Sequence, residues 1–284
     1  QLLTTPEFQG HFSSNSFAPR RLLPLLGVAE QEFSDKRALN NAQISASFAY
    51  KGQRVSLSKL KLKVDDTTAL GNLNINTSKS VSEFDADLAL DALDIDRYET
   101  RAPTAQKSNA PSAKTVPAKA APFAMLPDWR GNGKLSVKKL QFSNVELTDI
   151  QLSLRAEPGR WSLQPIQANF YQGRYQGGIE LARSTGKQMR LKVNERVQNV
   201  NLALLTERYI PDLLKKNLGV KHLSGTANLS AQLDTQGTST TQWQHNANGN
   251  LGFTVKNGHL RGLSIFYRAC ELYLTSRGRP TPPH

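Results

Sequence analysis

The stretch RVSLSKLKLKVDDTTALGNLNI, Arg54 to Ile75, decides the fold class of this chain. Along it, apolar residues alternate with lysines, serines and asparagines: Val55, Leu57, Leu60, Leu62, Val64, Leu73 and Ile75. A period of two places successive side chains on opposite faces of a β-strand. The stretch therefore predicts strands with one apolar and one polar face, and the apolar face needs a cover.

The alternation contains steps of three residues. The step from Leu57 to Leu60 turns the rest of the strand to the other face unless a bulge or turn absorbs one residue. The segment LSVKKLQF, Leu135 to Phe142, repeats the local pattern of VSLSKLKL, Val55 to Leu62. Further three-residue steps run from Val137 to Leu140, from Phe142 to Val145 and from Leu147 to Ile150. These steps predict bulged, strongly curved strands or tight turns.

The remaining elements are also mostly strands. Alternation predicts strands over 84–90, 161–170, 175–181, 189–197, 225–233 and 249–255. The Asn-Gly pair in KNGHL, Lys256 to Leu260, is typical of a tight hairpin, and FYQGRYQGG, Phe170 to Gly178, fits a hairpin turn better than a phosphate cradle because a strand follows it. Helical spacing occurs only over 16–28, 202–219 and 263–274, and we expect short helices there at the ends or edges of a sheet.

A low-complexity segment divides the chain. Residues Glu99 to Ala124 are rich in Ala, Pro, Lys and Ser and have no apolar period, which predicts a flexible linker or disordered insertion. We therefore divide the chain into a first β segment over 1–98, the linker over 99–124 and a second β segment over 125–284. Composition leaves open whether the linker separates two domains or interrupts one sheet.

The composition restricts the kinds of partner. The net charge of +13 attracts any polyanion, but the chain has no motif typical of a nucleic-acid reader, so we expect no nucleic-acid partner. The single Cys270 excludes an internal disulfide. The longest apolar run, Leu22 to Ala29, is shorter than the ~20 residues of a membrane span. Because the chain starts without methionine, we interpret it as part of a longer protein whose membrane anchor lies elsewhere.

The sequence shows no pattern of an enzyme or a metal site. There is no G-x-S-x-G segment, and the five histidines lack metal-ligand spacing. Asp91, Asp94 and Asp96 lack the glycine and distal glutamate of a calcium loop, and Asp65 with Asp66 is typical of a turn. We therefore expect no catalytic residue, no metal and no cofactor. Lysines on the strands, such as Lys61 and Lys138, fit a solvated outer face, and contact with lipid phosphates is left open.

Three groups of segments resemble the AsmA family of bacterial envelope proteins, both in their local sequences and in their order along the chain. The first group is TPEFQGHFSSNSFAPRRLLPLLGV, ALNNAQISASFAYKGQRVSLSKLKLKVDDTTALGNLNI and FDADLALDALDIDRY, ahead of the Ala/Pro linker. The second is GNGKLSVKKLQFSNVELTDIQLSLRAEPGRWSLQPIQANFYQGRYQGGIEL, and the third is LSGTANLSAQL with GNLGFTVKNGHLRGLSI. The ending TSRGRPTPPH departs from the family pattern.

The resemblance implies a β-rich periplasmic body that a helix anchors to the inner membrane in the full-length protein. It also implies a fold similar to bridge-like lipid-transfer proteins: mainly β, with a long, curved, bulged antiparallel sheet that forms an open groove and a few short helices at its ends or edges. The implied role concerns phospholipid traffic and assembly of the outer membrane.

Two functions follow as hypotheses. In the first, a non-enzymatic module binds or guides phospholipid acyl chains in the apolar groove, and the candidate lining residues are Leu57, Leu60, Leu62, Leu140, Phe142, Leu147, Leu152 and Leu154. In the second, the protein is an assembly or chaperone-like factor that binds outer-membrane proteins through its exposed strand edges. A glycan- or nucleic-acid-binding β domain is a weaker third interpretation.

Overall fold

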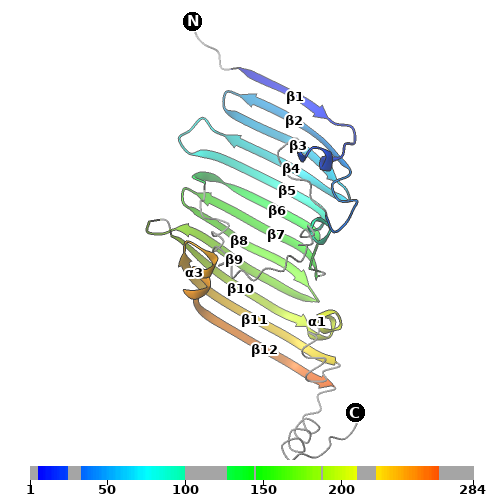
Figure 1. Cartoon of the computed structure of the whole chain (residues 1–284), viewed down its shortest axis with the longest axis vertical. Coiled ribbons are helices and arrows are strands. Elements are labelled where there is room, and N and C mark those ends of the chain that lie inside the picture. Colours follow the sequence, from blue (N-terminus) through cyan, green and yellow to red (C-terminus); the bar gives the residue numbers. More distant parts are fainter. Residues whose placement is uncertain are drawn as a thin grey trace, which may run out of the picture. The chain divides into compact units, whose positions relative to one another are not determined.

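A computed structural model describes residues 6–24, 33–99, 127–143, 145–186, 188–209 and 222–261. Within them the chain is mainly β and forms one open sheet of twelve strands, ordered β1 to β12 as in the sequence (Figure 1). The strands are β1 Glu7–Ser13, β2 Ala42–Lys51, β3 Arg54–Val64, β4 Thr67–Asn76, β5 Ser82–Asp94, β6 Trp129–Phe142, β7 Val145–Glu157, β8 Arg160–Phe170, β9 Gly173–Arg183, β10 Met189–Asn201, β11 His222–Gly237 and β12 Asn248–Arg261. The predicted fold class is confirmed.

The chain contacts divide the structure into two compact units. Unit 1 comprises Gln1–Phe170, Tyr175–Arg196 and Ser230–Leu251, and unit 2 comprises Tyr171–Arg174, Val197–Leu229 and Gly252–His284. Unit 1 holds β1 to β8 and portions of the last four strands. Unit 2 holds the other portions of those strands together with the helix α1, Leu202–Tyr209.

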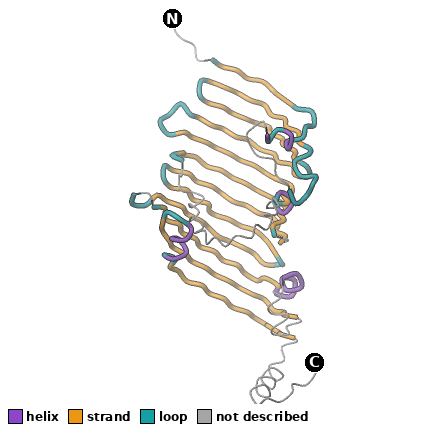
Figure 2. Tube along the Cα trace, in the orientation of Figure 1, coloured by secondary structure: helices purple, strands orange, loops and turns teal. Residues whose placement is uncertain are grey.

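The sheet continues across the linker. Strand β5 pairs with β6 in parallel, with Leu88 opposite Leu135, whereas the pairs from β1 to β5 and from β6 to β8 are antiparallel. Figure 2 shows that strands make up most of the described chain. A parallel pair needs a long connection, and residues 95–128 supply it. Residues 100–124 of the predicted linker, with the two residues that follow it, lie outside the described residues. The segments on either side of the linker thus contribute neighbouring strands to one sheet.

Bulges absorb the three-residue steps. Between Leu57 and Leu60 the register with β4 shifts, and Lys59 has a φ of +53°. Leu57 then lies opposite Leu73 and Leu60 opposite Gly71, so both leucines stay on the same face. In β7 the step from Leu147 to Ile150 contains Asp149 with a φ of +52°. The predicted bulges are therefore present.

The turns and helices agree with the predictions only in part. The β8–β9 connection is a hairpin turn in which Tyr171 and Gln172 have positive φ. KNGHL is not a hairpin, because β12 runs through it and Asn257 has a φ of +52° inside the strand. The helix expected over 16–28 is a 3-10 turn, η1, Pro19–Arg21, and the candidate over 263–274 lies outside the described residues.

Two further short helical elements complete the described chain. The 3-10 turn η3, Asp96–Tyr98, follows β5. The helix α3, Thr240–His245, was not predicted from the sequence; Ser239 caps it by accepting a hydrogen bond from the Gln242 backbone N–H. No helix in the described parts of the chain is long and apolar enough to cross a membrane.

Acidic residues close one end of the strands in unit 1. The Asp65 carboxylate accepts hydrogen bonds from the backbone N–H groups of Leu39, Asn40 and Asn41 and from the Tyr98 hydroxyl at 3.1 Å. Burial, followed by the Asp65 charge, raises the pKa of Tyr98 to about 12. Asp91 likewise accepts from the Thr68 N–H at 2.7 Å. Both carboxylates satisfy backbone donors, and the position of Asp65 agrees with its interpretation as a turn residue.

An apolar face as the candidate functional site

The apolar side chains of unit 1 gather on one side of β3 to β10, which we call the apolar face. Because paired residues on neighbouring strands point to the same side, the register arranges them in rows across the sheet. One row contains Leu60, Gly71, Leu88, Leu135, Leu152 and Ile166, and the next contains Leu62, Ala69, Leu90, Val137 and Ile150. A third contains Leu57, Leu73, Ala86, Gly133, Leu154 and Leu163.

The structure brings the eight predicted lining residues to this face. Leu57, Leu60 and Leu62 lie in the three rows on β3, and Leu152 and Leu154 continue two of those rows on β7. Leu140 and Leu147 pack against Val137 and Ile150 in a small apolar cluster that also contains Ala168. Phe142 lies at the end of β6, opposite Val145, and is 49% exposed.

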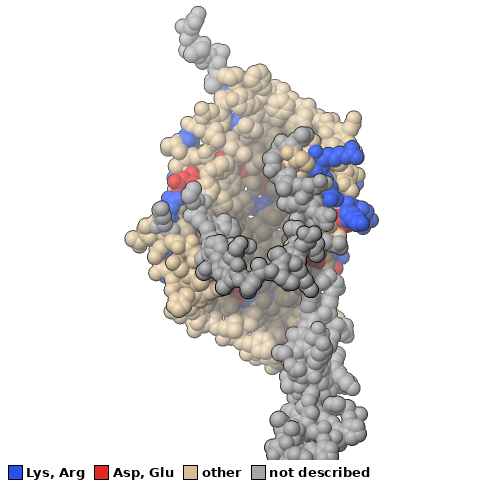
Figure 3. Space-filling view, in the orientation of Figure 1, with Lys and Arg blue, Asp and Glu red and all other residues tan. Residues whose placement is uncertain are grey.

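Among the described residues, no second layer covers the apolar face. Its leucines are only half-buried, and the well-buried side chains are limited to small groups such as Val137, Ile150 and Ala168. Leu70 points to the other side of β4 and is 50% exposed. The leucines of the apolar face are less exposed than Leu70, because they cover one another. Figure 3 shows the surface hollowed over the middle strands of unit 1, with charged residues at the margins of the hollow.

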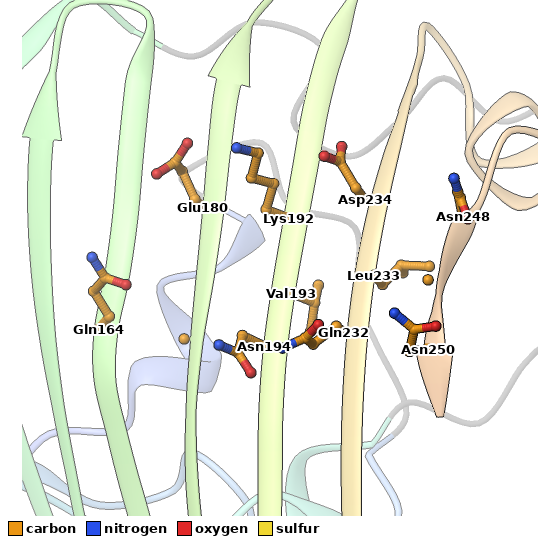
Figure 4. Close-up of a pocket in the computed structure, with 12 residues that line it drawn as sticks. Gln164, Glu180, Lys192, Val193, Asn194, Gln232, Leu233, Asp234, Asn248 and Asn250 are labelled. Atoms are coloured by element: carbon orange, nitrogen blue, oxygen red, sulfur yellow. The ribbon is translucent and has the colours of Figure 1, made fainter. Parts of the chain in front are cut away.

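The opposite side of the same strands, the polar face, carries most of the charge. Lys61 and Lys63 point to it from β3, and ion pairs link neighbouring strands there, including Arg160 with Glu180 at 2.6 Å and Arg190 with Asp234 at 2.5 Å. Figure 4 shows a depression on this side in which Glu180, Lys192 and Asp234 lie in one row across three strands. Such exposed pairs contribute little to stability but keep this face solvated.

Two depressions on the polar face are lined mainly by polar side chains and backbone. The first is lined by amides, paired charges and backbone, including Gln164, Asn194 and Gln232. A second, between Arg54 and Arg130, is similar in character. Within the described residues, no group of three or more His, Cys, Asp or Glu side chains is placed to hold a metal ion. The apolar face, rather than a polar depression, is therefore the candidate functional site.

One polar residue on the apolar face was missed by the sequence reasoning. Glu195 on β10 has the same orientation as Met189 and Leu191, which pack with Leu181 and Trp161. Its carboxyl group lies beside the Tyr175 hydroxyl and above Gly177, where an added Cβ would come within 1.9 Å of Oε2. Burial raises the pKa of Glu195, and the Tyr175 hydroxyl opposes this shift by hydrogen bonding to the carboxyl. In the segment MRLKVNERV, Glu195 occupies the position where the alternation requires an apolar residue.

Comparison with known proteins identifies a family for this chain but no individual relative. Searches with the chain returned no match among curated proteins and none among solved structures. The model of the AsmA family matches residues 28–275, which is most of the chain. AsmA is a bacterial envelope family, so the match indicates an envelope-related role. The chain belongs to the AsmA family.

Proposed function

We propose that this chain is a non-enzymatic periplasmic module that binds or guides phospholipid acyl chains on its apolar face. In this proposal a membrane anchor outside the chain holds the full-length protein at the inner membrane, and the module contributes to lipid homeostasis and biogenesis of the outer membrane. The observation that carries the proposal is the continuous set of apolar rows without a protein cover among the described residues.

The dimensions of the rows fit an acyl chain. A row from β3 to β8 crosses five strand spacings of ~4.8 Å, or about 24 Å, which is the length scale of an extended lipid tail. Each methylene removed from water contributes ~0.8 kcal/mol, so enclosing half of an ~16-carbon tail contributes about 6 kcal/mol before the entropic cost of binding. The contacts are distributed over many side chains, which suits a guide that lipids slide along.

Charge supports contact with anionic lipid surfaces. The chain carries a net charge of +13, and Arg21, Lys36 and Arg37 are exposed in the segment that joins β1 to β2. Figure 3 shows basic atoms gathered at one margin of the visible surface. Cations of this kind are attracted to the phosphate groups of a membrane surface. In the proposal the tails lie on the apolar face while headgroups stay near charged margins.

The test uses a photo-crosslinking residue at one of two adjacent positions of β7. Leu152 lies on the apolar face, opposite Leu135 and Ile166, whereas Gln151 lies on the polar face, opposite Ser136 and Gln167. Crosslinking from position 152 should capture phospholipid, while position 151 should capture little. Native mass spectrometry of the gently purified protein should show bound phospholipid. Equal capture at both positions, or a protein that carries no lipid, would refute the proposal.

A specific observation also supports the second function, assembly of outer-membrane proteins. Strand β1 ends the sheet order, all its residues are exposed, and Phe8 and Phe12 are 60% and 37% exposed. An edge strand of this kind can add a strand from a client protein. Binding of peptides from unfolded outer-membrane barrels by a lipid-free protein, with loss of binding when proline replaces Gln9 or His11, would favour this function over lipid binding.

A further inference from the structure

Glu195 is the one acidic residue whose side chain lies on the apolar face of β9 and β10 in unit 1 among the described residues. On β10 it follows Leu191 and Val193 along the face, and on β9 the same face carries Tyr175, Gly177, Ile179 and Leu181. Ile179 is 37% exposed, so this part of the face is open to a ligand. At other positions of this face a bound acyl chain would contact methyl and methylene groups, but at position 195 it would contact a carboxyl group.

The carboxyl group is poorly solvated but not paired with a cation. Its Oε2 atom is fully buried and has no hydrogen-bond partner in the described structure. The glycine at position 177 leaves the space that the carboxyl occupies, since a Cβ there would also come within 2.7 Å of the Tyr175 hydroxyl. The charged groups on the adjacent strands, Glu180, Arg190, Lys192, Arg196 and Asp234, have side chains on the polar face. Tyr175 is thus the only titratable group that faces Glu195 within the described part of unit 1.

We propose that Glu195 and Tyr175 form a protonation-dependent acyl-binding subsite, in which a lipid tail lies over Glu195 only when the carboxyl is neutral. The inference rests on the proposed function, since it assumes that tails occupy the apolar face. A tail that covers the carboxyl removes water from its remaining exposed side, and loss of water destabilises the charged form. Proton uptake therefore accompanies binding, and lipid affinity rises as the pH falls.

The structure supports this direction. Burial already raises the pKa of Glu195 in the lipid-free protein, and a covering tail raises it further. Between the two pKa values, affinity changes by up to tenfold per pH unit, because one proton is bound with the lipid. Removing the Tyr175 hydroxyl, which hydrogen-bonds the carboxyl and lowers the pKa of Glu195, moves this window to higher pH.

The experiment measures the affinity of the whole chain for a fluorescent phospholipid over a pH range that begins near the ordinary pKa of glutamate and extends upward, from about pH 4 to about pH 8. The wild-type protein should bind more tightly at low pH. Glu195→Gln should bind with a nearly constant affinity that exceeds the wild-type affinity at high pH. Tyr175→Phe should keep the pH dependence with its midpoint at higher pH.

The matched control is Glu180→Gln, on the same strand pair but on the polar face, where Glu180 pairs with Arg160. It should keep the wild-type pH dependence. A wild-type affinity that is flat with pH, or a pH dependence that survives in Glu195→Gln, would overturn the inference while leaving lipid binding intact. Absence of lipid binding at every pH in every variant would instead refute the proposed function.

Discussion

The open apolar face predicts that two neighbouring side chains of β7 will rank differently in stability and in lipid binding. Ile150 is 6% exposed and packs with Val137 and Ala168, whereas Leu152 is half-buried. Changing either residue to alanine removes three carbons. At ~0.8 kcal/mol per buried carbon, Ile150→Ala should lower the free energy of unfolding by about 2.4 kcal/mol, and Leu152→Ala by a smaller amount, about 1.6 kcal/mol. No closed cavity forms on an open face, so the additional cavity cost of a sealed core does not apply.

Lipid binding should reverse this order. A bound tail covers the exposed part of Leu152, which is at most about a third of its surface, so Leu152→Ala loses up to about 0.8 kcal/mol of contact, equivalent to a roughly fourfold larger dissociation constant. Ile150 is already covered by its neighbours and offers little surface to a tail, so Ile150→Ala should change lipid affinity less. Urea unfolding of the lipid-free protein, with the slope unchanged, measures the first quantity, and titration with a fluorescent phospholipid measures the second. The same rank order in both assays, or a cost of Leu152→Ala near 4 kcal/mol, would refute an open, lipid-accessible face.

Three more predictions concern the elements that hold the apolar face together. Lys59 has a φ of +53° at its bulge, so Lys59→Val should be less stable than Lys59→Gly by at least about 1 kcal/mol, measured by urea unfolding; equal stabilities would argue against the bulge. Asp65→Ala should cost about 3 kcal/mol because three backbone N–H groups lose their acceptor, while Asp66→Ala, at an 88% exposed side chain, should have a small effect. The pKa of Tyr98 is raised to about 12, so the stability that its neutral hydroxyl contributes is complete below about pH 10 and is lost as the pH rises toward 12. Tyr98→Phe should therefore flatten the dependence of the free energy of unfolding on pH in this range. An unchanged pH dependence would contradict the buried hydrogen bond with Asp65.

The sequence predicts the strands and their faces because alternation is a local property. Val55, Leu57 and Leu60 indicate both the strand and its bulge, since only an absorbed residue keeps all three on one face. The parallel pairing of β5 with β6 was beyond prediction, because the connection between them has no pattern that indicates where β6 returns.

The errors have local physical causes. Asn257 and Gly258 in β12 have the residue types of a hairpin turn, but a bulge also needs a positive φ, and sequence alone does not distinguish the two. In unit 2 the Cα of Gly258 lies 2.9 Å from the position of a Cβ added to Gly225, so close backbone approach also explains a glycine. The helix α3 was missed because six residues are too few for an apolar period. Glu195 was detectable, since it replaces an apolar residue in a regular alternation.

The bulges determine whether the apolar side chains can act as one surface. If β3 ran regularly through Lys59 without the bulge, Leu60, Leu62 and Val64 would point to the polar face, and two rows would lose their β3 members. A single apolar substitution within a row removes only its own contact with a tail, so its effect on binding should be graded. Deletion of Lys59 leaves a two-residue step from Leu57 to Leu60, so the rows and lipid binding should survive it. Insertion of one residue between Leu60 and Lys61 instead turns Leu62 to the polar face and Lys61 and Lys63 to the apolar face, so it should weaken lipid binding more than a single leucine change on β3. A surface that works by area is robust to point changes and vulnerable to changes of register.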